Sequence, residues 1–373
     1  MRSRSRSPSR SPSRRTAAGA ALSAAVALVL LAVGCSSTTS GEKPAKSTQS
    51  SGSGGGTDKP IVLSLATPMG ASEEFDAFLR NVRTLSHGSI RISAEFDAHH
   101  EEGPDFEEQL LNDVQAGRVD LAALGSRVFD IHRAPALGAL TAPLLINSFD
   151  AEEKVLGAPV AQQMIREVDG GGLTGVGLLP GSLRRPFGAG TPLLGPQDYK
   201  GRTIGIQESK VADSTMRALG ATPEWFGAGG SVTGFDGFEQ QIGSVNGSRY
   251  DEAGMIGTAN VVLWPRPIVL VANTKAVERL GEDRRKLLRE AARQAVHGAG
   301  ADLRAEENRD LESLCARGQK FAAASPAQLA ALRKAVQPVY DRLSRDRQTK
   351  EYLDTITTLV REVPTEPPVS CKG

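Results

Sequence analysis

IVLSLATP at residues 61–68, followed by SEEFDAFLRNVRTL at 72–85, is the stretch that decides the fold class. Its first part is an apolar, β-rich run that ends at Pro68, which predicts a buried strand. In the second part, apolar residues from Phe75 to Val82 recur at helical spacing. The folded part of the chain is therefore expected to open with a strand followed by a helix.

The same alternation continues along the rest of the chain. Strands are predicted at 89–96, 119–124, 173–179, 202–206 and 268–272, and helices at 106–116, 155–168 and 210–219. Helical pattern then dominates from 282 to about 318, and an unbroken helix of that length would reach about 54 Å. Because this exceeds the width of one small domain, the helix must bend or bridge two domains. Strands that alternate with helices imply an α/β fold with mainly parallel sheets.

The composition is that of a globular chain with room for about two domains. Of its 373 residues, 39% are hydrophobic and 23% are charged. Six of the 44 lysines and arginines lie in residues 1–34, which hold no acidic residue, so 38 basic residues stand against 43 acidic ones in the remainder. A mildly acidic body without a basic face argues against nucleic acid as a partner, because phosphate binding needs clustered lysine and arginine.

Residues 1–34 are typical of a lipoprotein signal peptide. Six arginines precede an apolar run of small residues at 17–33, which is the order of regions in a secretory signal. The run ends in LAVGC at 31–35, which resembles a bacterial lipobox and predicts lipidation of Cys35. The Ser-, Thr- and Gly-rich segment at 35–58 has the composition of a flexible tether. We therefore expect export and lipid anchoring to the outer face of the cell membrane, with a retained membrane anchor and a splicing-type Arg-Ser tract as the alternatives.

Cys315 and Cys371 are the only thiols left once Cys35 is lipidated. In an oxidising compartment, two such cysteines are expected to pair. The predicted disulfide would fix the Pro-rich C-terminal tail at 364–373 to the end of the long helix. The spacing of the three cysteines offers no zinc site of the paired-cysteine kind.

Signatures of catalysis are scarce. GGGLTG at 170–175 has the spacing of a dinucleotide fingerprint, but it follows a predicted helix and precedes a strand, the reverse of the required context. The neighbours His99, His100, Glu101 and Glu102 favour a solvated loop over a metal site, because adjacent residues rarely converge on one ion. The remaining histidines are dispersed and form no triad. We expect a protein that is not an enzyme and that uses no cofactor and no metal.

Four short phrases carry a family resemblance: QAGRVDL at 115–121, LTAPLL at 140–145, PQDYKG at 196–201 and ALGATP at 218–223. In this order and spacing they resemble the solute receptors of tripartite ATP-independent periplasmic (TRAP) transporters, of the dicarboxylate-receptor type. The resemblance covers roughly residues 61–343. It implies a periplasmic-binding-protein-like fold of two α/β lobes, with the ligand enclosed between them and a long helix spanning both.

The resemblance also implies how the chain divides between the lobes. Lobe I is expected at 59–182 and 270–310, lobe II at 183–269 and 311–363, and a tail at 364–373. A receptor of this kind captures a small molecule by lobe closure, with carboxylate-bearing molecules among the candidates, and delivers it to the membrane permease subunits of a secondary transporter. The alternatives are an orphan ligand-sensing lipoprotein for another importer or a sensor, a secreted hydrolase, and a structural lipoprotein of the cell envelope.

The resemblance further implies which arginine holds the ligand. The family recognises carboxylates with an arginine at the end of the strand that follows the Lys-Gly phrase, and Gly205 stands at that position here. A second family arginine lies on the preceding crossover strand, where Arg185 matches best, with a solvent-exposed arginine as the alternative. With one such cation the site is expected to prefer monocarboxylates or neutral polar solutes to dicarboxylates.

Further ligand contacts are expected around this arginine. Candidates in the first lobe are the strand end at Gly125, Ser126 and Arg127, the helix start at Glu107, and the turn at Met69. In the second lobe the candidates are Gln207, Trp225 and Tyr250, although aromatic residues are more often part of the core.

Overall fold

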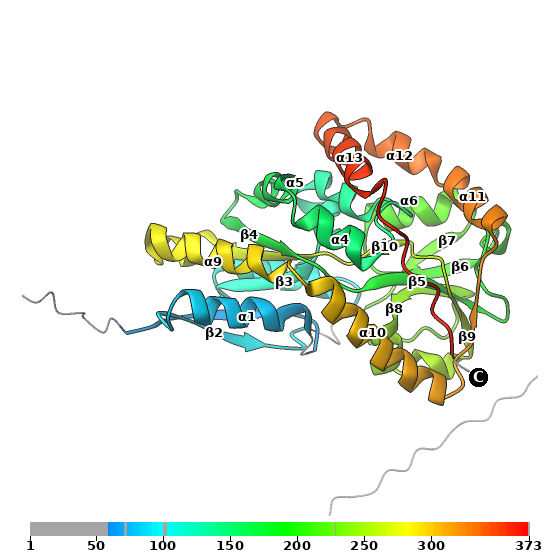
Figure 1. Cartoon of the computed structure of the whole chain (residues 1–373), viewed down its shortest axis with the longest axis horizontal. Helices are drawn as coiled ribbons and strands as arrows, with labels where there is room; N and C mark the ends of the chain where they lie inside the picture. Colours follow the sequence, from blue (N-terminus) through cyan, green and yellow to red (C-terminus); the bar gives the residue numbers. More distant parts are fainter. Residues whose placement is uncertain (1–58, 71–72, 100–102, 228, 372–373) are drawn as a thin grey trace, which may run out of the picture. The chain divides into compact units, whose positions relative to one another are not determined.

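The computed structural model describes residues 59–70, 73–99, 103–227 and 229–371 (Figure 1). The predicted signal peptide, the tether and Cys35 lie outside the described residues, as do His100, Glu101 and Glu102. Among the described helices, none combines the length and the apolar character needed to cross a membrane.

One sheet, which we call lobe I together with its helices, has five strands in the order β2-β1-β3-β11-β4. They are β1 (Ile61–Ala66), β2 (Ile90–Glu95), β3 (Leu121–Gly125), β4 (Leu173–Leu179) and β11 (Ile268–Asn273). The first three strands run parallel, and β11 is antiparallel to both of its neighbours. All six residues of β11 are buried. This central strand returns to lobe I from late in the sequence, so the lobe closes only when distant segments of the chain meet.

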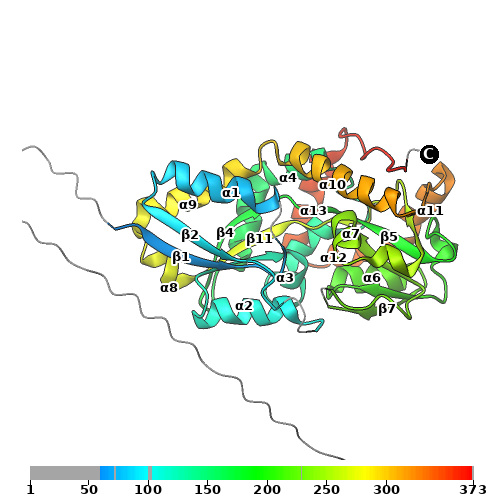
Figure 2. The ribbon, with the colours of Figure 1, turned by 90° about the horizontal axis from the view of Figure 1, so that it is seen from below.

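Helices cover both faces of this sheet (Figure 2). On one face, α1 (Glu73–Leu85) and α9 (Gly281–Ala295) pack with Leu63, Leu65 and Leu270 in one hydrophobic cluster. The other face is covered by α2 (Phe106–Ala116), η1 (Pro135–Thr141), α4 (Phe149–Leu156), α5 (Pro159–Met164), η2 (Ile165–Val168) and α13 (Arg347–Val360). The neighbouring residues Leu270 and Val271 enter opposite clusters, as the alternation of side chains in a strand requires.

The second sheet, which defines lobe II, follows the order β12-β9-β5-β8-β6-β7, and β10 pairs with β5. Its strands are β5 (Leu183–Ala189), β6 (Thr203–Ile206), β7 (Thr222–Trp225), β8 (Gly237–Gln241), β9 (Met255–Thr258), β10 (Trp264–Pro265) and β12 (Phe321–Ala322). Its helices are η3 (Pro196–Asp198), α6 (Lys210–Ala218), α7 (Ile242–Gly247), η4 (Tyr250–Ala253), α11 (Pro326–Ala335) and α12 (Gln337–Leu343). Strands β6, β7 and β8 are parallel, whereas β5 is antiparallel to its partners. The α/β fold with parallel-rich sheets is therefore confirmed.

Two short crossovers join the lobes. The chain leaves β4 for β5 through residues 180–182 and returns from β10 to β11 through 266–267. The two crossovers lie side by side, because the Arg266 backbone N–H donates to the Ser182 carbonyl at 3.0 Å. Nearby, the start of α3 (Arg127–His132) is joined to the second crossover by Ser126, whose N–H donates to the Pro267 carbonyl at 2.8 Å.

The long helical region predicted from 282 to about 318 is two helices, α9 and α10 (Ala299–Ala316). They meet at Gly298, whose φ of 80° places it in the left-handed region that glycine adopts without strain. Helix α10 then packs on α1 and α4 of lobe I and on α7 of lobe II. The region therefore both bends and bridges, the two outcomes expected from its length.

The helix expected at 155–168 is wrong as a single element. Helix α4 ends at Leu156 with Gly157 as its C-cap, and Pro159 then begins α5, which continues as η2. A proline in a helix interior removes a hydrogen bond and clashes with the preceding turn, so it opens a new helix instead.

The C-terminal tail crosses back from lobe I to lobe II. The Ser148 hydroxyl donates to the Pro364 carbonyl at 2.8 Å, and the Val369 N–H donates to the Ala259 carbonyl at 2.9 Å. The predicted disulfide between Cys315 and Cys371 is present, with Cα atoms 5.3 Å apart. It fixes the tail to the end of α10.

Candidate functional site

A cavity of about 440 Å³ opens between the two lobes. Met69, which follows β1, and Gln207, which follows β6, both line it. Strands of both lobes thus direct their carboxyl ends at the cavity, where open α/β sheets bind ligands. Arg266, from the crossover between the lobes, completes this part of the wall.

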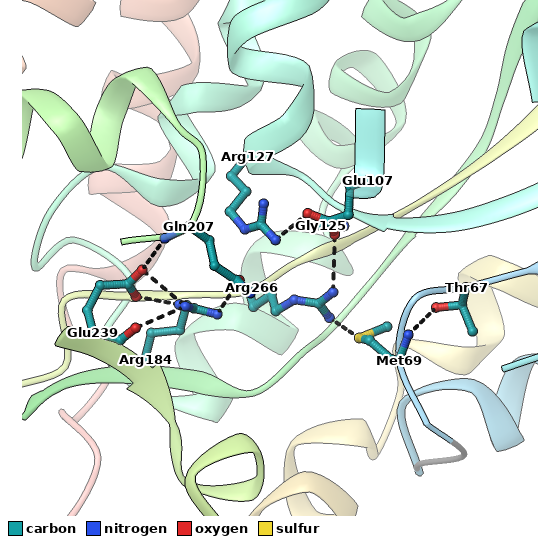
Figure 3. Close-up of polar contacts among 9 residues, drawn as sticks. All are labelled: Thr67, Met69, Glu107, Gly125, Arg127, Arg184, Gln207, Glu239 and Arg266. Atoms are coloured by element: carbon teal, nitrogen blue, oxygen red, sulfur yellow. Dashed lines mark hydrogen bonds and ion pairs between the residues drawn. The ribbon is translucent and has the colours of Figure 1, made fainter. Parts of the chain in front are cut away.

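Arg184, at the start of β5, is the cation that lobe II presents to the cavity (Figure 3). Its guanidinium forms an ion pair with Glu239 on β8, and Nη2 donates to Oε1 of that carboxylate at 3.0 Å. Nη1 donates to Oε1 of Gln207 at 3.0 Å. Only 1% of Arg184 is exposed, so its orientation is fixed by these partners and not by solvent.

Glu107, in the first turn of α2, pairs with two further arginines, Arg127 and Arg266 (Figure 3). Its Oε1 accepts from Nη2 of Arg266 at 3.3 Å and from the Gly125 N–H at 2.9 Å, and its Oε2 pairs with Arg127. The Arg127 guanidinium also lies over the Phe106 ring, 5.9 Å from its centroid. These contacts join the lobe I strand end to the crossover.

The polar cluster at this wall is rich in buried guanidinium groups. Three buried guanidinium groups, those of Arg127, Arg184 and Arg266, face two buried carboxylates, those of Glu107 and Glu239. Burial is the main cause that lowers the pKa of Arg127; Glu107 opposes this effect, and the neighbouring Arg266 adds to it. Guanidinium groups suit carboxylate ligands because they offer paired, planar donors.

Arg185, the expected principal contact, does not line the cavity. Successive side chains of a strand point to opposite faces, so Arg184 and Arg185 diverge. The Arg185 Nη2 donates to Oε1 of Glu307 on α10 at 3.0 Å, and only 1% of the residue is exposed. The arginine that reaches the cavity from β5 is therefore one residue earlier than expected.

Gly205 stands where the family places its other arginine. The space that a side chain would need there is filled by a neighbouring ring. A Cβ atom built on Gly205 would lie 2.6 Å from the Phe235 ring. A side chain at this position would have to displace that ring.

The other expected contacts divide into three groups. Met69, Gln207 and Tyr250 line the main cavity. Ser126 and Arg127 line a small adjoining pocket of about 10 Å³, and the Gly125 N–H reaches the cluster through Glu107. Trp225 is 47% exposed at the end of β7 and lines neither space.

The sequence reasoning missed Arg184 and Arg266, and it also missed a set of acidic residues on α10. Arg266 carried a usable signal, because it is an isolated charge between two prolines in the apolar run VVLWPRPIVLV at 261–271. The acidic residues carried none, since charge on a helix usually marks a solvated face.

No group of histidine, cysteine and acidic side chains suited to a metal ion occurs in the described part of the chain, which leaves out 100–102. Of the loop considered as a metal site, His99 Nε2 lies 2.9 Å from Oδ2 of Asp113.

Comparison with known proteins places these features in a family. The model of the bacterial extracellular solute-binding proteins of family 7 matches residues 67–346. The C4-dicarboxylate-binding periplasmic protein DctP of Rhodobacter capsulatus is 26% identical over 118 residues, which is 32% of this chain and 35% of the relative. The uncharacterized protein YiiZ of Salmonella typhimurium is 23% identical over 196 residues, 51% of this chain and 59% of the relative. These alignments span about a third to three fifths of the relatives' length.

Solved structures share the fold. A TRAP periplasmic solute-binding protein from Bradyrhizobium, in complex with galacturonate, has a TM-score of 0.71 at 20% identity and covers 80% of this chain and 100% of its own. One from Shewanella oneidensis with bound succinate has a TM-score of 0.67 at 20% identity and covers 80% and 99%. The order of strands, the cavity between two lobes and the match over residues 67–346 lead to one conclusion. The chain belongs to family 7 of the bacterial extracellular solute-binding proteins.

Proposed function

We propose that this protein is an extracytoplasmic receptor that captures a small carboxylate-bearing molecule by lobe closure and delivers it to membrane permease subunits of a secondary transporter. The observation that carries the proposal is a cluster of buried arginines and glutamates, from which Arg184 and Arg266 reach the wall of the cavity. Arg184 and Arg266, the members of the cluster that line the cavity, present guanidinium donors to it. A carboxylate of the ligand can accept from these paired, planar donors.

The position of Arg266 couples this capture to lobe closure. Its backbone lies in the crossover from lobe II, and its guanidinium reaches Glu107 of lobe I. Arg184 approaches from lobe II. A carboxylate held between the two guanidinium groups would contact both lobes and favour the closed arrangement over the open one.

The proposal is tested by calorimetric titration of D-galacturonate and succinate into the wild-type protein, Arg266→Ala and Arg184→Lys. Arg266→Ala leaves Glu107 paired with Arg127, and Arg184→Lys keeps a cation beside Glu239. We expect each variant to lose at least about tenfold in affinity for any carboxylate that the wild type binds, as hydrogen bonds to charged groups imply.

Arg217→Ala is the matched control, because Arg217 pairs with Asp213 on the exposed side of α6 and lies outside the cavity. The control should bind like the wild type. Equal affinities of Arg266→Ala and the wild type would contradict the role of the cluster.

We propose in addition that the receptor is a lipoprotein anchored through Cys35. The support is the LAVGC phrase at 31–35 and the polar segment that follows it. A diacylglyceryl group together with an acyl chain provides the two-chain anchor that stable membrane residence requires. Cys35→Ser should therefore move the protein from the membrane fraction to the soluble fraction. A variant that stays in the membrane with its apolar run uncleaved would point to a retained anchor instead.

A further inference from the structure

The wall of the cavity that belongs to α10 is acidic. Glu306, Glu307 and Asp310 line the cavity from one side of this helix, since residues three and four positions apart lie on the same face. Gly243 of α7 leaves room for the Asp310 carboxylate, because a Cβ atom there would lie 2.9 Å from Oδ2 of Asp310. The cavity therefore has guanidinium groups at one wall and carboxylates at another.

Glu307 has one carboxylate oxygen that receives no hydrogen bond from the described residues. The residue is 8% exposed, and its Oε1 accepts from Nη2 of Arg185 at 3.0 Å. Among the described residues, no donor makes a hydrogen bond to its Oε2. A buried carboxylate oxygen without a donor is costly, and such atoms in a cavity wall point to a donor supplied by a ligand.

Two further residues that line the cavity add acceptors. Oε1 of Gln241 likewise receives no hydrogen bond from the described part of the chain. Asp310 adds a carboxylate, whose Oδ1 accepts from Nδ2 of Asn246 at 2.7 Å. Burial raises the pKa of Glu307; Arg185 opposes this effect, and Asp310 adds to it. A cation bound beside the two carboxylates would compensate the cost of burying the Glu307 charge. It would also reduce the repulsion between Glu307 and Asp310.

We propose that the cavity binds a zwitterion, with its carboxylate on Arg184 and Arg266 and its ammonium group on Glu307 and Asp310. This inference rests on the receptor function proposed above and specifies its ligand class. An ammonium group offers three donors and a positive charge to a wall of acceptors. A neutral hydroxyl group offers one donor and no charge, and a second carboxylate would meet the acidic wall with like charge.

Matched ligands separate these three chemistries. We would titrate 4-aminobutyrate, 4-hydroxybutyrate and succinate, and the larger pair 2-amino-2-deoxygluconate and gluconate, into the wild-type protein at neutral pH. We expect each amine to bind at least about tenfold more tightly than its hydroxyl counterpart, and succinate to bind most weakly of the three small probes.

Variants of the acidic wall then assign the effect to α10. Asp310→Asn keeps the size of the side chain and removes its charge, so the preference for the amine over its hydroxyl counterpart should fall below about threefold. Glu306→Gln provides a second, independent variant of the same wall. Glu312→Gln, an exposed residue of the same helix, is the control and should keep the wild-type preference.

The outcomes separate this inference from the receptor function. If hydroxyl compounds or succinate bind as tightly as the amines, or if no amine binds, the zwitterion proposal is overturned. Where the hydroxyl compounds still bind and lose affinity in Arg266→Ala, the receptor function stands without it. If no carboxylate of either kind binds, both proposals fail.

Discussion

Single side chains on β5 set the chemistry of the cavity. Arg184 turns to the cavity and Arg185 to the interior, where it meets Glu307. Both are buried, but only Arg184 is in a position to share its donors with a ligand. Arg185 instead compensates a carboxylate that would otherwise be buried without a cation. The two neighbours therefore affect different measurable properties, ligand affinity and stability.

Arg185→Ala is expected to destabilise the fold more than it weakens binding. Removing one partner of a buried pair leaves an uncompensated charge and typically costs about 3–5 kcal/mol; the Arg185 and Glu307 side chains are only 1% and 8% exposed. Urea denaturation should show this loss, and Arg266→Ala should show a smaller one because Glu107 keeps Arg127. A wild-type unfolding free energy for Arg185→Ala would contradict the assignment.

On β5, the arginine that lines the cavity lies one residue before the arginine predicted from the sequence, and the rest of the candidate site was predicted only in part. An error of one position reverses the face that a strand residue occupies, and no local pattern distinguishes two adjacent arginines. Glu307 is 122 positions from Arg185, so their contact follows from the packing of α10 and not from any motif. Lobe I contacts at Glu107 and Arg127 were easier to anticipate, because both lie beside ends of predicted elements.

Among the elements, α10 links the lobes and forms one wall of the cavity. Its start depends on Gly298, and its end is held by Arg317, whose Nε donates to Oδ2 of Asp251 at 2.6 Å. Periodicity predicted the helical region but not the position of the break, because a glycine at a bend and a glycine within a helix look alike in sequence. Pro159, by contrast, was a readable signal for the end of α4.

The contact at the end of α10 predicts a pH dependence of stability. The hydrogen bond from Arg317 holds the pKa of Asp251 below its ordinary value of 3.8. Because the folded-state pKa is lowered, the stabilisation is present above the ordinary pKa and is lost as the pH falls through the lowered value.

Asp251→Asn should therefore unfold at lower urea concentration than the wild type from pH 7 down to about pH 4, and the gap should close only at more acidic pH. A gap that is absent at pH 7, or that already closes between pH 7 and pH 5, would contradict this account.

At the scale of the whole folded body, binding depends on how closely the lobes approach. Gly227 of lobe II meets the backbone of lobe I, since a Cβ atom on it would lie 2.5 Å from the Gly103 carbonyl oxygen. On the same body, the tail and its disulfide join α4 of lobe I to the end of α10. The two lobes are thus in direct contact, and the C-terminal tail connects them a second time.

Gly227→Ala should hinder closure without changing any residue that lines the cavity. Part of the binding free energy would then be spent on displacing the Gly103 backbone, and we expect a loss of about tenfold in affinity for a bound carboxylate. Calorimetry measures the loss, and Thr233→Ala, an exposed change in the same connection, serves as the control. An unchanged affinity in Gly227→Ala would show that this contact does not limit closure.

The most direct test of the central claim is mass spectrometry of the small molecule that remains bound when the protein is purified under native conditions. We expect a compound with a carboxylate group in the wild-type protein and its loss from Arg266→Ala. Retention of the same compound in equal amount by the variant, or a bound compound without a carboxylate, would contradict the claim that the arginine cluster is the ligand site.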